Sequence, residues 1–148
     1  MKLHRRALFR RLLTVAAVMA VPRWLFAARP DAAFSSESVE GAINGLFDEA
    51  AIESDLVTLK IPDIAENGAV VPVSVSTELA DVESISIIVD NNPTPLAALF
   101  EMSPQSVPDV SVRIKMGKSS TVRTIVKAGG KLYTTGKEVK VTIGGCGG

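Results

Sequence analysis

The stretch Val71-Pro72-Val73-Ser74-Val75-Ser76 decides the fold class, because valine alternates there with proline and serine at a period of two. Successive side chains of a β-strand point to opposite faces, so this alternation predicts a strand with one buried face. The pattern returns in residues 110–116, where Val110, Val112, Ile114 and Met116 alternate with polar residues. Since Pro72 has no amide hydrogen, we expect its strand to lie at a sheet edge or to begin with a bulge.

Further short apolar segments surround these two strands on both sides. They cover residues 57–61, 82–89, 96–100, 122–128, 131–134 and 139–143. Turn-forming residues separate the strands at 66–68, 91–93, 117–120, 129–130 and 135–136. Seven or eight such strands predict a mostly β protein, with an immunoglobulin-like antiparallel β-sandwich over residues 56–143. A closed barrel is the alternative, since residues 28–148 lack the disulfide and the tryptophan usual in immunoglobulin domains.

Residues 28–55 are expected to form a lead and an amphipathic helix in front of the sandwich. The lead, residues 31–38, is small and polar and is predicted to be disordered. Ser38 is a favourable N-cap for a helix that would run to about Glu53. The apolar stripe of this helix comprises Ile43, Leu46, Phe47 and Ala50. Because Gly41 and Gly45 weaken the helix, we expect it to need a docking surface.

Residues 1–27 have the order of an export signal: a basic segment, an apolar run from Leu12 to Val21, and small residues near Ala27. The pair Arg5-Arg6 resembles the twin-arginine type of signal, which predicts a periplasmic protein. The apolar run is about half of the roughly 20 residues that a spanning helix needs, so we expect no stable membrane anchor. An uncleaved N-terminal anchor is the alternative.

Removal of residues 1–27 leaves ten Lys and Arg against sixteen Asp and Glu, a net charge of −6. This balance and the few aromatic residues disfavour nucleic-acid binding. The charges are also segregated, because residues 31–109 carry fifteen acids and one base, whereas residues 113–140 carry eight bases and one acid. Either the late basic strands pair with early acidic ones, or they form a positive surface that favours an anionic group near the C-terminus.

The composition excludes several kinds of catalytic site. The only histidine is His4, inside the predicted signal, so the exported chain has no imidazole for a Ser-His-Asp or Cys-His site. One cysteine and no histidine exclude the usual zinc and copper sites, and no glycine-rich phosphate loop precedes a helix. We therefore expect no catalytic residues, no metal and no cofactor.

The remaining chemical group is Cys146, the single cysteine, in the sequence Gly144-Gly145-Cys146-Gly147-Gly148. Glycine permits backbone conformations closed to other residues, so residues 144–148 are predicted to form a flexible arm. An extended arm would carry the thiol roughly 10 Å beyond the last strand. This arrangement favours a thiol that carries a group into the cleft of another protein. An intermolecular disulfide is the alternative, and a self-sufficient thiol oxidoreductase is disfavoured because no second cysteine or base is present.

Three stretches of the sequence resemble the SoxY family of the bacterial sulfur-oxidising (Sox) system. The first is the glycine-flanked Cys146 after residues 138–143, and the second is Ile64-Ala65-Glu66-Asn67-Gly68-Ala69-Val70-Val71-Pro72-Val73. The third is Asn91-Asn92-Pro93 followed by Pro95. The twin-arginine signal agrees with the same family.

The resemblance implies a carrier protein and not an enzyme. Cys146 would be the covalent attachment site for thiosulfate and related sulfur species, on the arm formed by Gly144, Gly145, Gly147 and Gly148. The partners would be a SoxZ-like subunit in a heterodimer, the haem enzyme SoxAX, the hydrolase SoxB and, where present, the sulfane dehydrogenase SoxCD. The rival function is an exported immunoglobulin-like scaffold or adhesion module linked through a Cys146 disulfide. Residues 64–73 are interpreted as a tight Asn-Gly hairpin or, alternatively, as a partner surface.

Overall fold

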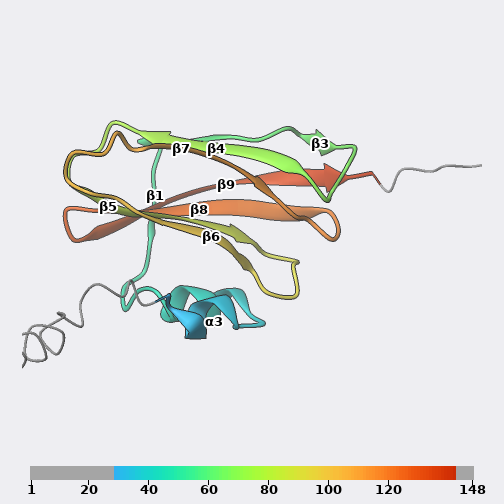
Figure 1. Ribbon diagram of the computed structural model, residues 1–148, viewed down its shortest axis with the longest axis horizontal. Helices are drawn as coiled ribbons and strands as arrows, with labels where there is room; N and C mark the ends of the chain where they lie inside the picture. Colours follow the sequence, from blue (N-terminus) through green and yellow to red (C-terminus); the bar gives the residue numbers. More distant parts are fainter. Residues whose placement is uncertain (1–28, 143–148) are drawn as a thin grey trace, which may run out of the picture.

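The computed structural model describes residues 29–142 as a sandwich of two β-sheets with a helical layer on one outer face (Figure 1). The sandwich predicted from the period-two pattern is therefore confirmed. It contains nine strands among the described residues, two of which have only two residues each. No helix between residues 29 and 142 is long and apolar enough to cross a membrane.

The larger sheet has six strands. Their order is β1 (Ile52–Glu53), β9 (Lys131–Val141), β8 (Ser120–Ala128), β5 (Val82–Val89) and β6 (Leu96–Glu101), and β3 (Ile64–Ala65) also pairs with β9. The pairs among β9, β8, β5 and β6 are antiparallel, whereas β1 and β3 both run parallel to β9. Short strands thus cover both ends of the β9 edge.

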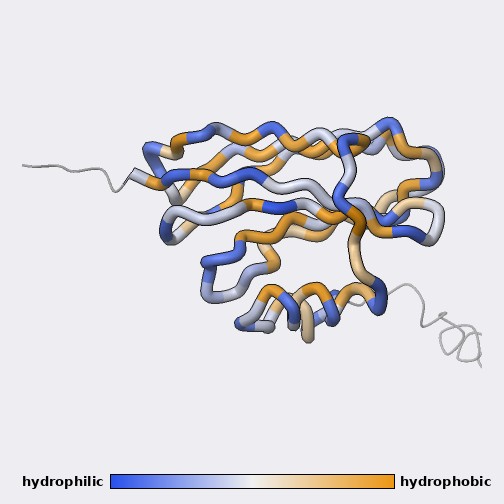
Figure 2. The backbone as a smooth tube through the Cα atoms, turned by 180° about the vertical axis from the view of Figure 1, so that it is seen from behind, coloured by the Kyte–Doolittle hydropathy of each residue, from blue (hydrophilic) through white to orange (hydrophobic). Residues whose placement is uncertain are grey.

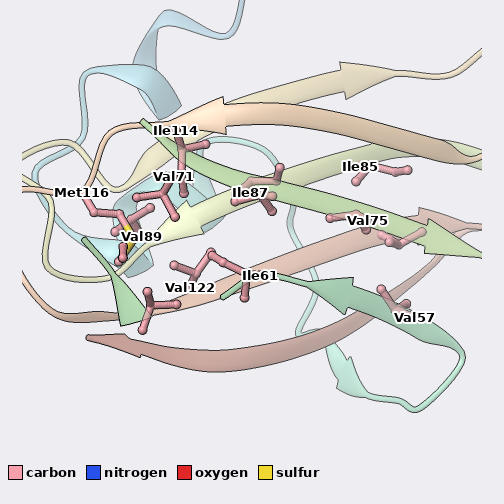
Figure 3. Close-up of a cluster of buried hydrophobic side chains, with 14 of the residues drawn as sticks. Val57, Ile61, Val71, Val75, Ile85, Ile87, Val89, Ile114, Met116 and Val122 are labelled. Carbon is pink, nitrogen blue, oxygen red and sulfur yellow. The ribbon is translucent and has the colours of Figure 1, made fainter. Parts of the chain in front are cut away.

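The smaller sheet has the order β2 (Val57–Lys60), β4 (Val71–Thr77), β7 (Asp109–Ile114), and both pairs are antiparallel. Hydrophobic and hydrophilic residues alternate along the strands in Figure 2, as the sequence pattern requires. The buried side chains of both sheets meet in one core, which includes Val71 and Ile114 of the small sheet and Val89 of the large one (Figure 3). Burial of this apolar surface is the main stabilising contribution to the sandwich.

The expectation of an edge strand or an initial bulge at Pro72 is wrong, because β4 is the central strand of the small sheet and pairs with β7 in continuous register. Its pairing with β2 runs only from Thr77 to Ser74, so Pro72 lies beyond the end of β2. On its other side Pro72 lies opposite Arg113 of β7. The missing amide hydrogen is tolerated because only one neighbouring strand reaches Pro72.

The last two predicted strands, 131–134 and 139–143, are joined as far as Val141 in one strand, β9. Gly136, expected in a turn, pairs with Arg123 of β8 in an unbroken register. The pairing with β8 supplies hydrogen bonds on that side of Gly136, and these outweigh the weak strand preference of glycine. The turn at Gly129-Gly130 is confirmed, since both glycines have positive φ and close the β8–β9 hairpin.

The helical layer differs from its prediction. The expected disordered lead contains a short helix, α2 (Asp31–Phe34), and the capped helix, α3 (Val39–Asn44), ends well before Glu53. Ser38 is its N-cap as predicted, because its hydroxyl oxygen accepts a hydrogen bond from the Gly41 amide at 3.0 Å. A β-carbon at Gly45 would lie only 2.9 Å from the Ala33 backbone, so the close approach of α2 to the end of α3 requires glycine.

Both helices pack on the outer face of the larger sheet (Figure 1). The buried residues of this second cluster are Ala33, Ala42 and Phe47 from the helical layer and Ile88, Leu96, Ile125 and Leu132 from the sheet. The predicted docking of the helical segment is thus confirmed, although the segment turns after α3 and continues into β1.

Candidate functional site

The predicted site residues Cys146, Gly144, Gly145, Gly147 and Gly148 lie outside the described residues, as do Arg5 and Arg6 of the predicted signal. What the structure describes is the part of β9 that leads to Cys146. We call residues 140–142 the arm root. They lie at the end of the sandwich where β9 finishes, next to β3 (Figure 1).

Each amide of the arm root donates a hydrogen bond. On one side, the Lys140 amide donates to the Asp63 carbonyl at 2.9 Å and the Thr142 amide donates to the Ala65 carbonyl at 3.1 Å. On the other side, the Val141 amide donates to the hydroxyl oxygen of Ser119 at 2.9 Å. The backbone is therefore held within the sheet as far as Thr142.

The first of the two internal stretches that resemble SoxY, residues 64–73, lies beside the arm root. Asn67 forms a turn in which its side-chain oxygen accepts from the Ala69 amide at 2.9 Å and its carbonyl accepts from the Val70 amide at 3.2 Å. The strands on either side of this turn, β3 and β4, belong to different sheets. The interpretation as a hairpin is therefore wrong, and the segment connects the two sheets instead.

The alternative interpretation of this segment, a partner surface, remains a proposal. Ile64 and Val70 have side chains that are 56% and 47% exposed, which is high for large aliphatic residues. Ile64 lies opposite Lys140 in the β3–β9 pair. The surface beside the arm root thus combines exposed apolar and basic groups.

The second internal stretch, Asn91-Asn92-Pro93, holds the turn between β7 and β8. The Asn92 side chain donates to the Lys115 carbonyl at 2.7 Å and accepts from the Gly117 amide at 3.1 Å. The Asn91 side chain donates to the Ser119 carbonyl at 3.0 Å. The first stretch thus pairs with the arm root and the second contacts the turn that binds it, although 17 residues of sequence lie between positions 73 and 91.

Two ion pairs reinforce this end of the sandwich. Asp90 accepts two hydrogen bonds from the Arg123 guanidinium, one of them from Nε at 2.8 Å, and this pairing raises the pKa of Arg123. Lys137 contacts the Asp63 carboxylate at 2.8 Å and donates to the Ile61 carbonyl at 3.0 Å. A third pair, Lys127 with Glu83, lies on β8 and β5.

These pairs bear out the first interpretation of the segregated charges, because each joins a base of β8 or β9 to an acid from earlier in the chain. Lys115, Lys118 and Lys140, by contrast, have no carboxylate within ion-pair distance among residues 29–142. All three are exposed and lie in the arm root or in the turn that contacts it. The second interpretation, a positive surface that favours an anionic group near the C-terminus, stays a prediction.

Sequence reasoning missed Ser119 and the roles of Asn91 and Asn92. The sequence marked residues 91–93 and 117–120 as turns, but it gave no sign that these turns bind one another or the end of β9. Within residues 29–142 no group of three His, Cys, Asp or Glu side chains is placed to hold a metal ion. The described part of the site can orient a chain segment through hydrogen bonds.

The family described as "Sulfur oxidation protein SoxY" matches residues 43–146, a range that includes the arm root and Cys146. The chain belongs to the SoxY family. The structure of the sulfur carrier protein SoxY from Chlorobium limicola f thiosulfatophilum matches with 42% sequence identity and a TM-score of 0.65, covering 72% of this chain and 97% of that one.

A more distant match shows the same fold outside the SoxY family. The superoxide reductase (neelaredoxin) from Ignicoccus hospitalis is 19% identical, with a TM-score of 0.53, over 58% of this chain and 80% of that one. At this identity the likeness concerns the sandwich alone. None of the curated proteins matches the chain.

Proposed function

We propose that this SoxY-family chain is a periplasmic sulfur carrier that holds thiosulfate-derived sulfur covalently on Cys146. The observation that carries the proposal is the family match through Cys146, the single cysteine of the chain. The sulfur carrier from Chlorobium, 42% identical, supports the same role. The fixed arm root supports it too, since it gives the segment that contains Cys146 a defined starting point.

The proposed loading step joins the Cys146 sulfur to the outer sulfur of thiosulfate. One S–S bond forms, the thiol loses its proton, and two electrons pass to a SoxAX-like haem enzyme. Water then attacks the terminal sulfone in a SoxB-like enzyme. The bond between the two outer sulfurs breaks, sulfate and two protons leave, and a persulfide anion remains on Cys146.

In this proposal catalysis belongs to the partners. The chain would act in a heterodimer with a SoxZ-like subunit and present its cargo to SoxAX-like, SoxB-like and, where present, SoxCD-like enzymes. The composition supports this division of labour, because the only histidine, His4, belongs to the predicted signal. The chain itself would need only to hold the thiol and deliver it.

Intact-mass spectrometry tests the attachment site. The chain incubated with thiosulfate and the loading enzyme is expected to gain a thiosulfonate adduct, and Cys146→Ser is expected to gain none. A matched control places a cysteine elsewhere: Ser106→Cys in the Cys146→Ser background should stay unmodified. Adducts on that control would show non-specific thiol chemistry. Adducts on the single variant Cys146→Ser, which has no cysteine, would refute the proposal.

Non-reducing electrophoresis separates the carrier from the scaffold alternative. A carrier is expected to work as a chain with a free or loaded thiol, whereas the scaffold requires a stable disulfide-linked species that disappears with Cys146→Ser.

The export signal is tested by the double variant Arg5→Lys, Arg6→Lys, which is expected to keep the chain in the cytoplasm. Unchanged export of that variant would contradict a twin-arginine route.

A further inference from the structure

The end of β9 extends past its main neighbour. Strand β8 begins at Ser120, which pairs with Val139, so no β8 residue lies opposite Lys140 or Val141. An amide that lies beyond the end of the neighbouring strand has no backbone carbonyl on that strand to accept its hydrogen bond. Here the hydroxyl of Ser119 takes the place of a strand carbonyl and accepts from the Val141 amide at 2.9 Å.

Ser119 is exposed, yet its backbone is held by the neighbouring turn. Asn91 contacts this segment at two residues, because its side chain donates to the Ser119 carbonyl at 3.0 Å and its amide donates to the hydroxyl of Ser120 at 2.9 Å. These contacts fix the segment that carries the Ser119 hydroxyl.

The start of the same turn is held as well. Met116 is buried in the core with 2% of its surface exposed, and its amide donates to the Gly68 carbonyl at 2.7 Å. Asn92 bonds to Lys115 and Gly117 on either side of it. The Ser119 hydroxyl is therefore presented from a turn that is anchored at both of its ends.

We propose that Ser119, oriented by Asn91, is a positioning residue for Cys146, because it keeps the arm root in the sheet. This inference rests on the proposed carrier function. With the root in place, four Cα–Cα steps lead from Thr142 to Cys146, and the Cys146 Cα can lie at most roughly 14 Å from the Thr142 Cα. If Val141 and Thr142 leave the sheet, six steps lead from Lys140 to Cys146, and the limit rises to roughly 21 Å.

A longer tether lowers the effective concentration of the thiol at a fixed site on a partner enzyme. The effective concentration of a tethered group falls with about the −3/2 power of tether length, so a change from four to six residues lowers it about twofold. The loss of a fixed exit direction adds to this effect, because the partner enzyme must then select one orientation among many. Ser119 should thus influence how readily a partner enzyme binds the segment that contains Cys146, and it should leave the intrinsic reactivity of the thiol unchanged.

Three variants test the inference in the full exported chain with its partner subunit. Ser119→Ala removes the acceptor, Ser119→Thr keeps a hydroxyl, and Ser106→Ala is the matched control. Ser106 accepts from the Ser103 amide at 3.2 Å in the loop after β6, at the opposite end of the sandwich. All three variants should unfold at the temperature of the wild type.

Hydrogen exchange provides the first measurement. Loss of one hydrogen bond of this kind should lower the protection of the Val141 amide by a factor of about two to ten in Ser119→Ala. The Thr variant should restore protection, and Ser106→Ala should leave it unchanged. Equal protection of Val141 in the wild type and Ser119→Ala would overturn the inference.

Loading kinetics provide the second measurement. With thiosulfate and the loading enzyme, Ser119→Ala is expected to raise the KM for the carrier by up to about twofold at nearly constant kcat, since the β3 hydrogen bonds of Lys140 and Thr142 remain. The rate with a small disulfide reagent in the absence of enzyme should stay the same. An unchanged KM, or an equal fall in the rate with the small reagent, would overturn the inference. If wild-type Cys146 is not loaded at all, the proposed function fails, and hydrogen exchange alone then decides whether Ser119 fixes the arm root.

Discussion

Gly68 lies against both the turn after β7 and the arm root, and its lack of a side chain permits this contact. A β-carbon on Gly68 would collide with the Met116 carbonyl oxygen and lie 2.9 Å from Cγ1 of Val141. The Gly68 carbonyl also accepts the Met116 amide, so the two backbones cannot separate without loss of that hydrogen bond. A single missing methyl group therefore allows three segments to meet.

Gly68→Ala is expected to lower the free energy of unfolding by about 1–3 kcal/mol, as overpacking in a tight contact does. Urea denaturation followed by circular dichroism measures the change. Gly117→Ala is the matched control in the neighbouring turn, because a β-carbon there has no atom within 4 Å. The control should stay within about 0.5 kcal/mol of the wild type. Equal stabilities of the two variants would show that the Gly68 contact can relax.

At the residue scale, the sequence predicted the turns but not the residues that they contact. Asn67-Gly68 and Asn91-Asn92-Pro93 were identified as turns because their residues favour turn conformations. Their hydrogen-bond partners are distant in sequence, as in the contact between Asn91 and Ser119, and no local propensity encodes such contacts. The role of Ser119 follows from the offset between the start of β8 and the end of β9, which only the pairing register reveals.

At the scale of elements, period and burial predicted the long strands well. The segments of β4, β5 and β7 were predicted because apolar residues repeat in them at every second position. The errors fell where tertiary contacts outweigh local preference. The pairing with β8 keeps Gly136 inside β9, and α3 ends at Asn44, where its C-cap Gly45 packs closely against Ala33 of α2.

The link between β5 and β8 makes the stability of the sandwich depend on pH. The hydrogen bond from Lys127 lowers the pKa of Glu83, and the Gly130 amide lowers it further. Since the pKa is lower in the folded chain than its ordinary value of 4.5, the ionised Glu83 stabilises the fold above that pH. The contribution is lost as the pH falls below 4.5 and through the lowered pKa of the folded chain.

Glu83→Gln should therefore lower the urea midpoint at neutral pH, and its difference from the wild type should shrink as the pH falls through the lowered pKa of Glu83 and the carboxylate is protonated. Lys127→Gln removes the partner and should have a similar effect at neutral pH. The double variant should cost less than the sum of the single variants, because the two groups act through one contact. Additive effects, or a difference between Glu83→Gln and the wild type that is constant with pH, would contradict this account.

At the scale of the whole molecule, the net charge disfavours the approach of the proposed anionic cargo. Without residues 1–27 the chain has a net charge of −6, and a negative chain repels an anion that approaches a thiolate. Lys115, Lys118 and Lys140, which form no ion pair with a carboxylate of residues 29–142, lie at the arm-root end and are expected to offset that repulsion locally. Glu66 and Glu138 are the nearby carboxylates in the sequence, so the net charge of this end is small and positive.

Replacement of all three lysines by glutamine should slow the reaction of Cys146 with an anionic disulfide reagent by about two- to tenfold at low salt. The reaction with a neutral disulfide reagent should change little, because no charge has to approach the thiol. At about 1 M salt the screening length falls to about 3 Å, and the difference between the two reagents should disappear. Stopped-flow absorbance of the released thiol measures both rates.

A pair of single variants separates a local field from the net charge of the chain. Lys118→Gln and Lys131→Gln each remove one exposed positive charge, but Lys131 follows the Gly129-Gly130 turn at the opposite end of β9. If the field is local, only Lys118→Gln slows the anionic reagent, since charges beyond a screening length of about 10 Å contribute little at 0.1 M salt. Equal slowing by both variants would mean that the anion responds to net charge alone. The segregation of bases into the late strands would then reflect pairing within the sandwich, as in Arg123 with Asp90, and would have no part in guiding an anion to Cys146.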